Sequence, residues 1–409
     1  MLLYPCFFVN LVHELKIAFI NRLMIISRLI LRNWKNFKEL DVKLQDRVII
    51  VGANASGKSN LLDVFRFLRD IAKPGGGLQK AVTDRGGITK IRSLAARKNP
   101  NVEIEVHLSE FGSDEVLWKY GIGIKQESRG YRLPYLSYEK VWKGDQLIVN
   151  RPEEDDNRDI ARLTQTYLEQ INTNKDFRDV VRFFENTLYL HLVPQLLKYP
   201  SSFTGPDLPG DPFGKGFLER VAKVNDKTRK SWLHKIEQAL KLAVPQLTHL
   251  EFTTENGYPH IEATYAHWRP GAGKQKEDQF SDGTLRLIGL LWALQEGDSL
   301  LLLEEPELSL NGAIVSKLAP LIHRLQKPRK RQVIISTHSS DLLNDRGISL
   351  NEVIVLEPAA EGTKACVASD IDEVKNMLKG GMTPASAIYQ SCYGTFRQFE
   401  KSIGSSFNF

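Results

Sequence analysis

The segment Gly52–Ser59 combines glycines, a lysine and a serine at a spacing that favours phosphate binding. Its letters, GANASGKS, fit the pattern GxxxxGK[ST], between a predicted strand and a predicted helix. Glycines let successive backbone N–H groups close around a phosphate, Lys58 reaches its outer oxygens, and the Ser59 hydroxyl is a ligand for Mg²⁺. We therefore expect ATP and Mg²⁺ as cofactors. The candidate binding residues here are Gly52, Asn54, Ser56, Gly57, Lys58, Ser59 and Asn60.

Two adjacent carboxylates, Glu304 and Glu305, follow the apolar run Leu300–Leu303. Because carboxylates are costly inside a core, they are expected at the carboxyl end of this strand, where open α/β sheets bind their ligands. Glu304 is predicted to hold the metal, and Glu305 to polarise a water molecule as general base. The pair indicates nucleotide hydrolysis.

Two further polar segments are predicted beside these groups. Ser281, Asp282 and Gly283 open a predicted helix and offer a hydroxyl and backbone N–H groups to an anion. The alternative is an ordinary helix cap, since Ser and Asp are good capping residues. His338 follows the apolar strand Val333–Ser336, so we expect it at the same sheet edge as Glu304, as a second catalytic residue that hydrogen-bonds a γ-phosphate.

Continuous apolar strands that alternate with helices predict a parallel sheet covered on both faces. Period-two alternation between residues 100 and 150 predicts an antiparallel meander, and the spacing of Phe183, Leu188 and Leu192 indicates helical structure. The other expected elements are strands at Ile25–Leu31, Leu40–Leu44, Val48–Val51, Leu300–Leu303, Val333–Ser336 and Val353–Leu356, and helices at Ser59–Ile71, Thr284–Leu294 and Ile314–Leu325.

Length and composition are those of a folded globular protein. The 409 residues suggest one large domain or two joined ones, and a net charge of +6 is a mild bias toward anionic partners such as nucleic acid. Three cysteines without a CxxC pair favour a reducing compartment, so a cytoplasmic location is expected. Charges at Glu14 and Lys16 break the apolar N-terminus, so no membrane span is predicted.

In order and spacing, these motifs resemble the ABC-like ATPases of the RecF, SMC and OLD group, also called AAA-family ATPases. The matching segments are Walker A at Gly52–Ser59, a signature at Ser281–Gly283, Walker B at Leu300–Glu305, a D-loop-like Ser309–Asn311, the switch residue His338 and an opening hairpin at Leu29–Phe37. The resemblance implies an α/β P-loop NTPase fold with an ABC-like head: a mixed sheet flanked by helices, an antiparallel β meander and an inserted helical lobe. Glu304 replaces the more usual Asp.

The same resemblance implies that two heads pair head-to-tail around ATP, with the signature of one covering the nucleotide of the other. We therefore expect a homodimer or a higher oligomer. The expected units are an N-terminal extension at 1–23, with a mis-called start as one explanation, the first part of the head at 24–154, the helical lobe at 155–275, the second part of the head at 276–360 and a tail at 361–409.

Two differences between this sequence and members of the group limit the functions that we expect of the chain. The interval from Ser59 to Ser281 contains the meander and leaves no room for a long coiled-coil arm, and the segment after His338 is short for an appended nuclease domain. We expect a stand-alone ATPase that regulates or recruits a separately encoded effector, such as a nuclease, in a bacterial antiviral defence or mobile-element module. The alternatives are a RecF-like DNA-binding ATPase in DNA repair and, less favoured, the nucleotide-binding subunit of a transporter.

Two weaker candidates complete the prediction. The basic cluster Lys327–Arg331 would contact nucleic-acid phosphates or form a solvated loop. Gln79 is a weak candidate for the glutamine that senses the nucleotide in this group.

Overall fold

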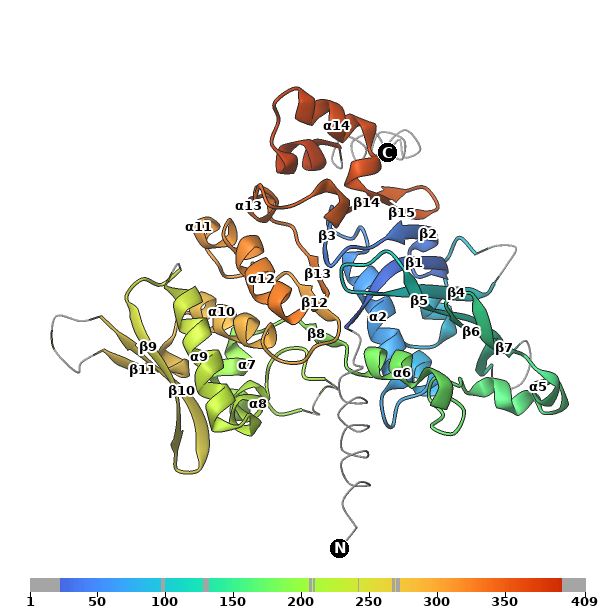
Figure 1. The fold of residues 1–409 in the computed structure, drawn as a ribbon, viewed down its shortest axis with the longest axis horizontal. Coiled ribbons are helices and arrows are strands. Elements are labelled where there is room, and N and C mark those ends of the chain that lie inside the picture. Colours follow the sequence, from blue (N-terminus) through green and yellow to red (C-terminus); the bar gives the residue numbers. More distant parts are fainter. Residues whose placement is uncertain are drawn as a thin grey trace, which may run out of the picture.

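The computed structural model describes residues 23–391 apart from 97–99, 128–131, 206–207, 209, 242, 267–268 and 270–272. Within this range the strands form two six-stranded sheets and one three-stranded sheet, with helices around them (Figure 1). Except for Leu23, the expected N-terminal extension lies outside the described residues, as does the end of the expected tail. No helix in the described part of the chain is long and apolar enough to cross a membrane.

The central sheet has the strand order β15-β14-β3-β13-β12-β8. All neighbours pair in parallel except β15, which is antiparallel to β14. Val48 and Ile50 of β3 belong to one apolar core, while Ile49 and Val51 belong to the other, so both faces are covered as predicted. The strands are β3 (Arg47–Gly52), β8 (Leu188–Leu190), β12 (Leu301–Glu304), β13 (Val333–Ser336), β14 (Val353–Ala359) and β15 (Gly362–Val367).

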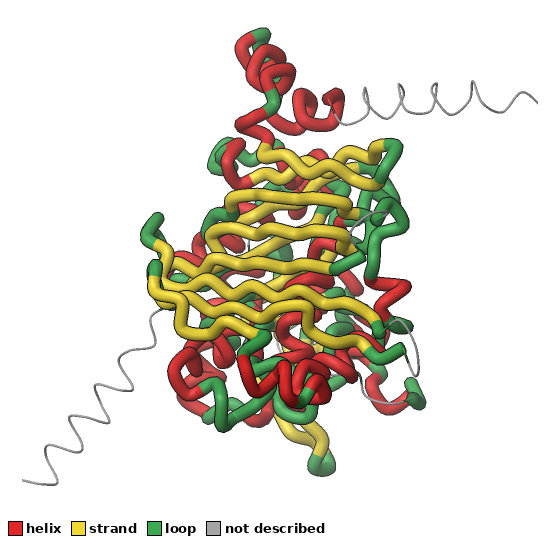
Figure 2. The backbone as a smooth tube through the Cα atoms, turned by 90° about the vertical axis from the view of Figure 1, so that its right-hand side faces the viewer, coloured by secondary structure: helices red, strands yellow, loops and turns green. Residues whose placement is uncertain are grey.

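The second sheet is the predicted antiparallel meander, with the order β2-β1-β4-β5-β6-β7. Figure 2 shows its strands side by side, facing the viewer. The apolar set of β4, which includes Val102, Ile104 and Val106, is buried as the alternation predicts. The strands are β1 (Met24–Trp34), β2 (Phe37–Lys43), β4 (Val102–Glu110), β5 (Val116–Gln126), β6 (Pro134–Lys143) and β7 (Gln146–Arg151).

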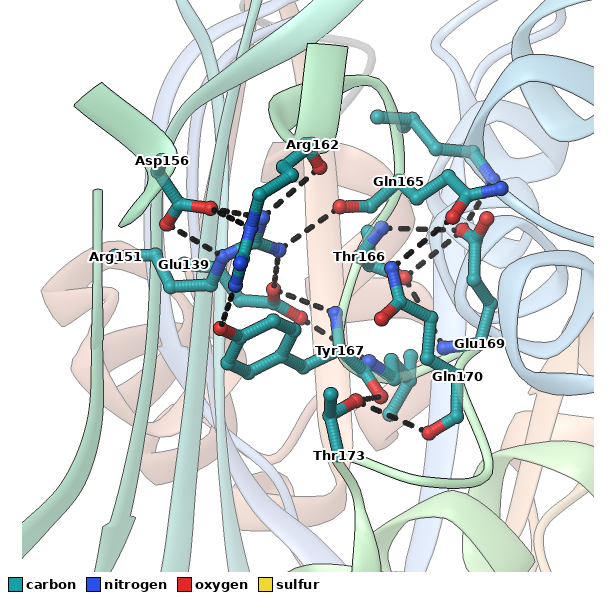
Figure 3. A network of polar contacts seen from close by, with 12 residues as sticks. Glu139, Arg151, Asp156, Arg162, Gln165, Thr166, Tyr167, Glu169, Gln170 and Thr173 are labelled. Atoms are coloured by element: carbon teal, nitrogen blue, oxygen red, sulfur yellow. Dashed lines mark hydrogen bonds and ion pairs between the residues drawn. The ribbon is translucent and has the colours of Figure 1, made fainter. Parts of the chain in front are cut away.

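A buried charge network fixes the chain where it leaves this sheet (Figure 3). Arg151 at the end of β7 donates to Glu139 of β6 and, through two nitrogens, to Asp156. Its remaining bonds go to the carbonyls of Arg162 and Gln165. All three charged side chains are at most 1% exposed, so removing one partner would leave an uncompensated buried charge.

Helices cover both faces of the central sheet. Helix α2 packs with the meander in the first core, while α10 and α12 pack in the second core together with α9. The helices are α2 (Lys58–Ala72), α3 (Leu78–Thr83), α4 (Ile88–Ile91), α5 (Glu154–Arg158), α6 (Arg178–Glu185), α7 (Pro194–Lys198), α8 (Phe217–Lys223), α9 (Asp226–Leu240), α10 (Asp282–Ala293), α11 (Gly312–Val315), α12 (Leu318–Gln326), α13 (Ser340–Leu343) and α14 (Asp372–Lys379).

The segment 155–275 contains strands as well as the expected helices. Leu188 lies in β8, an edge strand of the central sheet, so the helical interpretation of its spacing was wrong. Beyond α9 the chain forms the three-stranded sheet β9 (Leu247–Glu255), β10 (Tyr258–Tyr265) and β11 (Lys274–Lys276). The first strand beyond residue 361, β15, belongs to the central sheet. The division into units stays a prediction.

Candidate functional site

The phosphate loop, residues 52–59, connects β3 to α2 in the predicted way. Gly57 precedes the helix with a φ of 101°, in the left-handed region that favours glycine, and a Cβ there would lie 2.0 Å from Asn36 Nδ2. Lys58 is 6% exposed and folds back over the loop, where its Nζ donates to the carbonyls of Gly52 at 2.9 Å and Ala53 at 3.0 Å. The ammonium group is thus held over the strand-to-helix turn.

The other candidate residues of this loop lie in different settings. Asn54 is exposed, while Ser56 is buried and its Oγ has no hydrogen-bond partner among the described residues. The Asn60 side chain is engaged by Asn36, because its Nδ2 donates to Asn36 Oδ1 at 2.8 Å. Asn60 therefore supports the loop through Asn36.

Two segments from distant parts of the chain hold the Ser56 carbonyl. Asn36, in the turn between β1 and β2, donates to it at 3.0 Å, and the Thr363 hydroxyl of β15 donates to it at 2.8 Å. Asn36 Nδ2 also donates to Thr363 Oγ1 at 2.7 Å. We call these three residues the loop clamp. The sequence did not indicate this role of Thr363, because the residue lies in the segment 361–409, which is predicted to be a tail.

Glu304 ends β12 and faces the start of α2. The Ser59 hydroxyl donates to its Oε1, and the Tyr189 hydroxyl donates to its Oε2. His191 Nδ1 lies 3.2 Å from the main-chain oxygen of Glu304. The structure thus joins the two predicted metal ligands, Ser59 and Glu304, and adds Tyr189 and His191, which sequence reasoning missed.

Glu305 and His338 meet beside Lys58. Glu305 Oε1 is 3.1 Å from His338 Nε2, and His338 Nδ1 is 3.4 Å from Lys58 Nζ. Glu305 has a φ of 46°, rare for a residue with a side chain, and its N–H is held by the Ser336 carbonyl at 2.9 Å. These contacts bring together Glu305, His338 and Lys58, which are the predicted base, the predicted switch residue and the lysine predicted to bind phosphate.

Burial lowers the pKa of His338, and the nearby Lys58 charge lowers it further, against the opposing effect of Glu305 and Glu307. The imidazole is therefore neutral at pH 7, with one donor and one acceptor nitrogen. Lys58 can only donate, so Nδ1 accepts and the ring proton lies on Nε2, which is 3.1 Å from Glu305 Oε1. His338 is thus assigned a single tautomer by its partners.

Glu307 has a supporting role that the sequence did not reveal. Its Oε1 accepts from Thr337 Oγ1 at 2.5 Å and from the His338 N–H at 3.0 Å. It is 9% exposed and follows β12 closely, while Thr337 follows β13. Glu307 thus ties the ends of two neighbouring strands together and fixes the backbone from which His338 projects.

The signature residues begin α10 and contact neighbouring segments. Ser281 Oγ accepts from the Thr284 N–H at 3.1 Å, which is the capping bond of the alternative interpretation. Asp282 bonds Lys198 at 2.7 Å and Gln195 at 3.0 Å, both on α7. A Cβ on Gly283 would lie 2.7 Å from the Ser309 carbonyl. The described contacts of the signature are therefore with α7 and the D-loop-like segment.

The groups that converge at the carboxyl ends of β3, β12 and β13 fit a Mg²⁺-nucleotide. A hydroxyl and a carboxylate, from Ser59 and Glu304, are the hard oxygen ligands that Mg²⁺ prefers. The N–H groups at the start of the fifteen-residue helix α2 and the Lys58 ammonium supply donors and positive charge for phosphate oxygens.

Two weaker candidates are engaged elsewhere. Gln79 donates to the carbonyls of Pro134 at 2.7 Å and Thr164 at 2.8 Å, so it braces the meander. Within the basic cluster, Arg331 is 1% exposed and donates to the carbonyls of Ala293, Glu296 and Ser299. Neither alternative, contact with phosphates or a solvated loop, holds for Arg331, because its guanidinium binds backbone carbonyls inside the protein.

Residues 47–344 match the family model described as "AAA domain, putative AbiEii toxin, Type IV TA system". The chain also resembles "DNA replication and repair protein RecF" of Bacillus cytotoxicus, with 31% identity over 96 residues, or 22% of this chain and 24% of that one. The RecF protein of Bacillus thuringiensis gives 29% identity over the same length and shares. The chain thus spans about a quarter of the length of these curated relatives.

Among solved structures, the chain resembles the SMC head in "Crystal structure of the SmcHead bound to the C-winged helix domain of ScpA". The TM-score is 0.52 at 16% identity, over 83% of this chain and 97% of that one. At this identity the likeness concerns the fold alone. It confirms the predicted ABC-like head with its mixed sheet, and the family match confirms the predicted resemblance.

Proposed function

This chain belongs to the family described as "AAA domain, putative AbiEii toxin, Type IV TA system", and on that premise we propose that it binds ATP with Mg²⁺ and hydrolyses it. The observation that carries the proposal is the convergence of Lys58, Ser59, Glu304, Glu305 and His338 at one sheet edge. In an ATPase of this kind, Mg²⁺ neutralises charge that develops on the phosphates.

The roles of the side chains follow from their positions. Lys58 binds the outer phosphates, and Ser59 and Glu304 hold the metal. Glu305 accepts a proton from the attacking water. Neutral His338 has its Nε2 3.1 Å from Glu305 and its Nδ1 3.4 Å from Lys58, so it is close enough to Lys58 to reach a γ-phosphate. Ser281 and Gly283 belong to the signature that contacts the nucleotide of a second chain.

The test of this proposal is the variant Glu305→Gln. The amide keeps the shape of the side chain but cannot accept a proton, so phosphate release should fall by about 10²- to 10⁴-fold while ATP affinity is retained. Phosphate release and binding of a fluorescent nucleotide measure the two quantities. The exposed Glu115 of the meander supplies the matched control, Glu115→Gln, which should behave as wild type.

Two results would count against the assignment. If Glu304→Gln lowered phosphate release with ATP affinity retained, and Glu305→Gln did not, the roles of the two glutamates would be exchanged. Absence of any nucleotide binding by the wild-type protein would remove the proposed function itself.

We further propose that the ATPase works as a dimer that regulates or recruits a separately encoded effector in a bacterial defence or mobile-element module. The words "toxin" and "TA system" in the family description support this setting. Affinity purification from the native host should return a co-purifying protein whose retention changes with ATP. A second candidate, a DNA-binding ATPase in repair, is favoured by the 96-residue similarity to RecF, and retention of DNA in place of a protein would support it.

A further inference from the structure

Tyr189 lies in a position that the predicted chemistry does not use. It belongs to β8, the three-residue edge strand that pairs in parallel with β12, and it is paired with Leu302. Tyr189 is 6% exposed, and its hydroxyl donates to Glu304 Oε2. Since an ionised carboxylate accepts only, the phenol must be the donor, and the direction of this bond is fixed.

The other oxygen of Glu304 is the one that faces the phosphate loop. Oε1 accepts from Ser59 Oγ, so each carboxylate oxygen has a different partner. A glutamate has one more rotatable bond than the aspartate usual at this position, and it therefore needs more restraint to present one oxygen in one place. The Tyr189 hydroxyl supplies that restraint, because it binds the carboxylate oxygen that Ser59 does not contact.

Tyr189 is itself held in place. The guanidinium of Arg66, on α2, lies over its ring with 4.2 Å between the guanidinium carbon and the ring centroid. Two residues further along, His191 Nδ1 is 3.2 Å from the main-chain oxygen of Glu304. The edge strand and the residue after it thus contact both the side chain and the backbone of Glu304.

We propose that Tyr189 is a positioning residue that presents Glu304 Oε1 to the divalent cation and thereby sets the affinity of the nucleotide-bound site for that cation. This inference rests on the proposed function, because it takes Ser59 and Glu304 as the metal ligands. Partners that orient a ligand in this way commonly change metal affinity by about 10- to 100-fold when they are removed.

The test compares Tyr189→Phe with wild type in equilibrium binding. Mn²⁺ binding is followed by its electron paramagnetic resonance signal in the presence of a non-hydrolysable ATP analogue, and analogue binding is also measured in EDTA. The expected result is Mn²⁺ affinity weaker by about 10- to 100-fold, with metal-free binding of the analogue unchanged. Tyr135→Phe removes a hydroxyl from the meander and should change neither quantity.

A second variant separates positioning from packing. Glu304→Asp shortens the carboxylate by one methylene, so that it no longer bridges Ser59 and Tyr189, and Tyr189→Phe should then have no further effect on Mn²⁺ affinity in the double variant. Equal losses in both backgrounds would overturn the inference, as would an unchanged Mn²⁺ affinity in the single variant or a parallel loss of metal-free binding. If the wild-type protein binds neither analogue nor metal, the proposed function fails instead.

Discussion

At the scale of single residues, the site is organised around one neutral imidazole. His338 lies between a cation, Lys58, and a carboxylate, Glu305: its Nδ1 accepts from the Lys58 ammonium, and its Nε2 is 3.1 Å from Glu305 Oε1. Its backbone is held by Glu307. A γ-phosphate bound by Lys58 would therefore sit beside the same histidine that contacts the predicted base, which links recognition of the nucleotide to the position of Glu305.

We predict that Lys58→Met raises the pKa of His338 in the nucleotide-free protein. Lys58 is one of two causes that lower this pKa, and without its charge the carboxylates of Glu305 and Glu307 still act to raise it. Titration of the imidazole by NMR measures the change, with His338→Gln identifying the resonance among the nine histidines. Lys317→Met, which removes the charge of an exposed lysine, is the control and should leave the pKa of His338 unchanged.

The sign of the linked stability change follows from this shift. The folded pKa of His338 lies below its ordinary value of 6.5, so the unfolded chain takes up the proton first as the pH falls. The contribution of the neutral imidazole to the free energy of unfolding is therefore fully present above pH 6.5, and it is lost as the pH falls from there toward the folded pKa. Lys58→Met should therefore make this part of the acid sensitivity smaller, and a lowered or unchanged pKa would contradict the electrostatic picture of the site.

At the scale of elements, three strands could be placed from the sequence because each one can be recognised from its own residues. The apolar runs that end at Gly52, Glu304 and Ser336 are continuous and bounded by polar residues, and parallel strands bring such ends to one edge. Strand β8 could not be placed in this way. It has three residues, and its pairing with β12 joins segments far apart in the chain, so Tyr189 carried no local signal.

The loop clamp was hidden for a similar reason. Thr363 lies more than three hundred positions from Ser56, yet its hydroxyl is 2.8 Å from the Ser56 carbonyl. The Thr363 N–H also donates to the Asn36 carbonyl at 2.7 Å, so β15 is tied to the β1–β2 turn as well as to the loop. The β14–β15 hairpin, next to β3 in the central sheet, thereby restrains the conformation of the phosphate loop.

We predict that Thr363→Val lowers both stability and nucleotide affinity. Valine has nearly the same shape but no hydroxyl, so the Ser56 carbonyl keeps its bond to Asn36 and loses the one from Thr363, and Asn36 Nδ2 loses its bond to Thr363 Oγ1. The free energy of unfolding should fall by about 1 to 2 kcal/mol. If the same free energy is lost from the bound conformation of the loop, nucleotide affinity should fall by about 5- to 30-fold. Urea unfolding and fluorescent-nucleotide titration measure the two effects.

Thr363→Ser is the matched control, because it keeps the hydroxyl and should bind nucleotide nearly as wild type does. A loss of affinity in Thr363→Ser equal to that in Thr363→Val would show that packing of the methyl group, and not the hydrogen bond, matters at this position.

At the scale of the whole molecule, the signature and the phosphate loop belong to different parts of the structure. Helix α10 packs in the second core with the lobe helix α9, whereas α2 packs in the first core with the meander (Figure 1). Asp282 is tied to α7 by Lys198, so the start of α10 is fixed relative to the lobe. A nucleotide gripped by Lys58 of one chain and Ser281 of another would require two chains to close around it.

This arrangement predicts that two inactive variants restore activity when they are mixed. Lys58→Ala removes the phosphate-binding cation, and Ser281→Arg places a bulky cation at the seam between chains, so each variant alone should have little ATPase activity. In a mixed dimer one composite site carries both changes and the other carries neither. Random mixing should therefore recover up to about a quarter of wild-type phosphate release, since half of the dimers are mixed and each has one whole site.

Two controls make the mixing experiment decisive. Ser281→Arg alone should still bind fluorescent nucleotide, because its Lys58 is intact, and thermal unfolding should show that both variants are folded. Differently tagged chains report whether mixed dimers form, and ATP should favour them, because binding and dimerisation are linked equilibria. If mixed dimers form and phosphate release stays at the level of the separate variants, either Ser281 does not act on the nucleotide of the partner chain or the two sites cannot fire independently. Mixing Lys58→Ala with Glu305→Gln is the negative control: both changes lie on the phosphate-loop side of a site, so every composite site of that dimer is damaged and no recovery is expected.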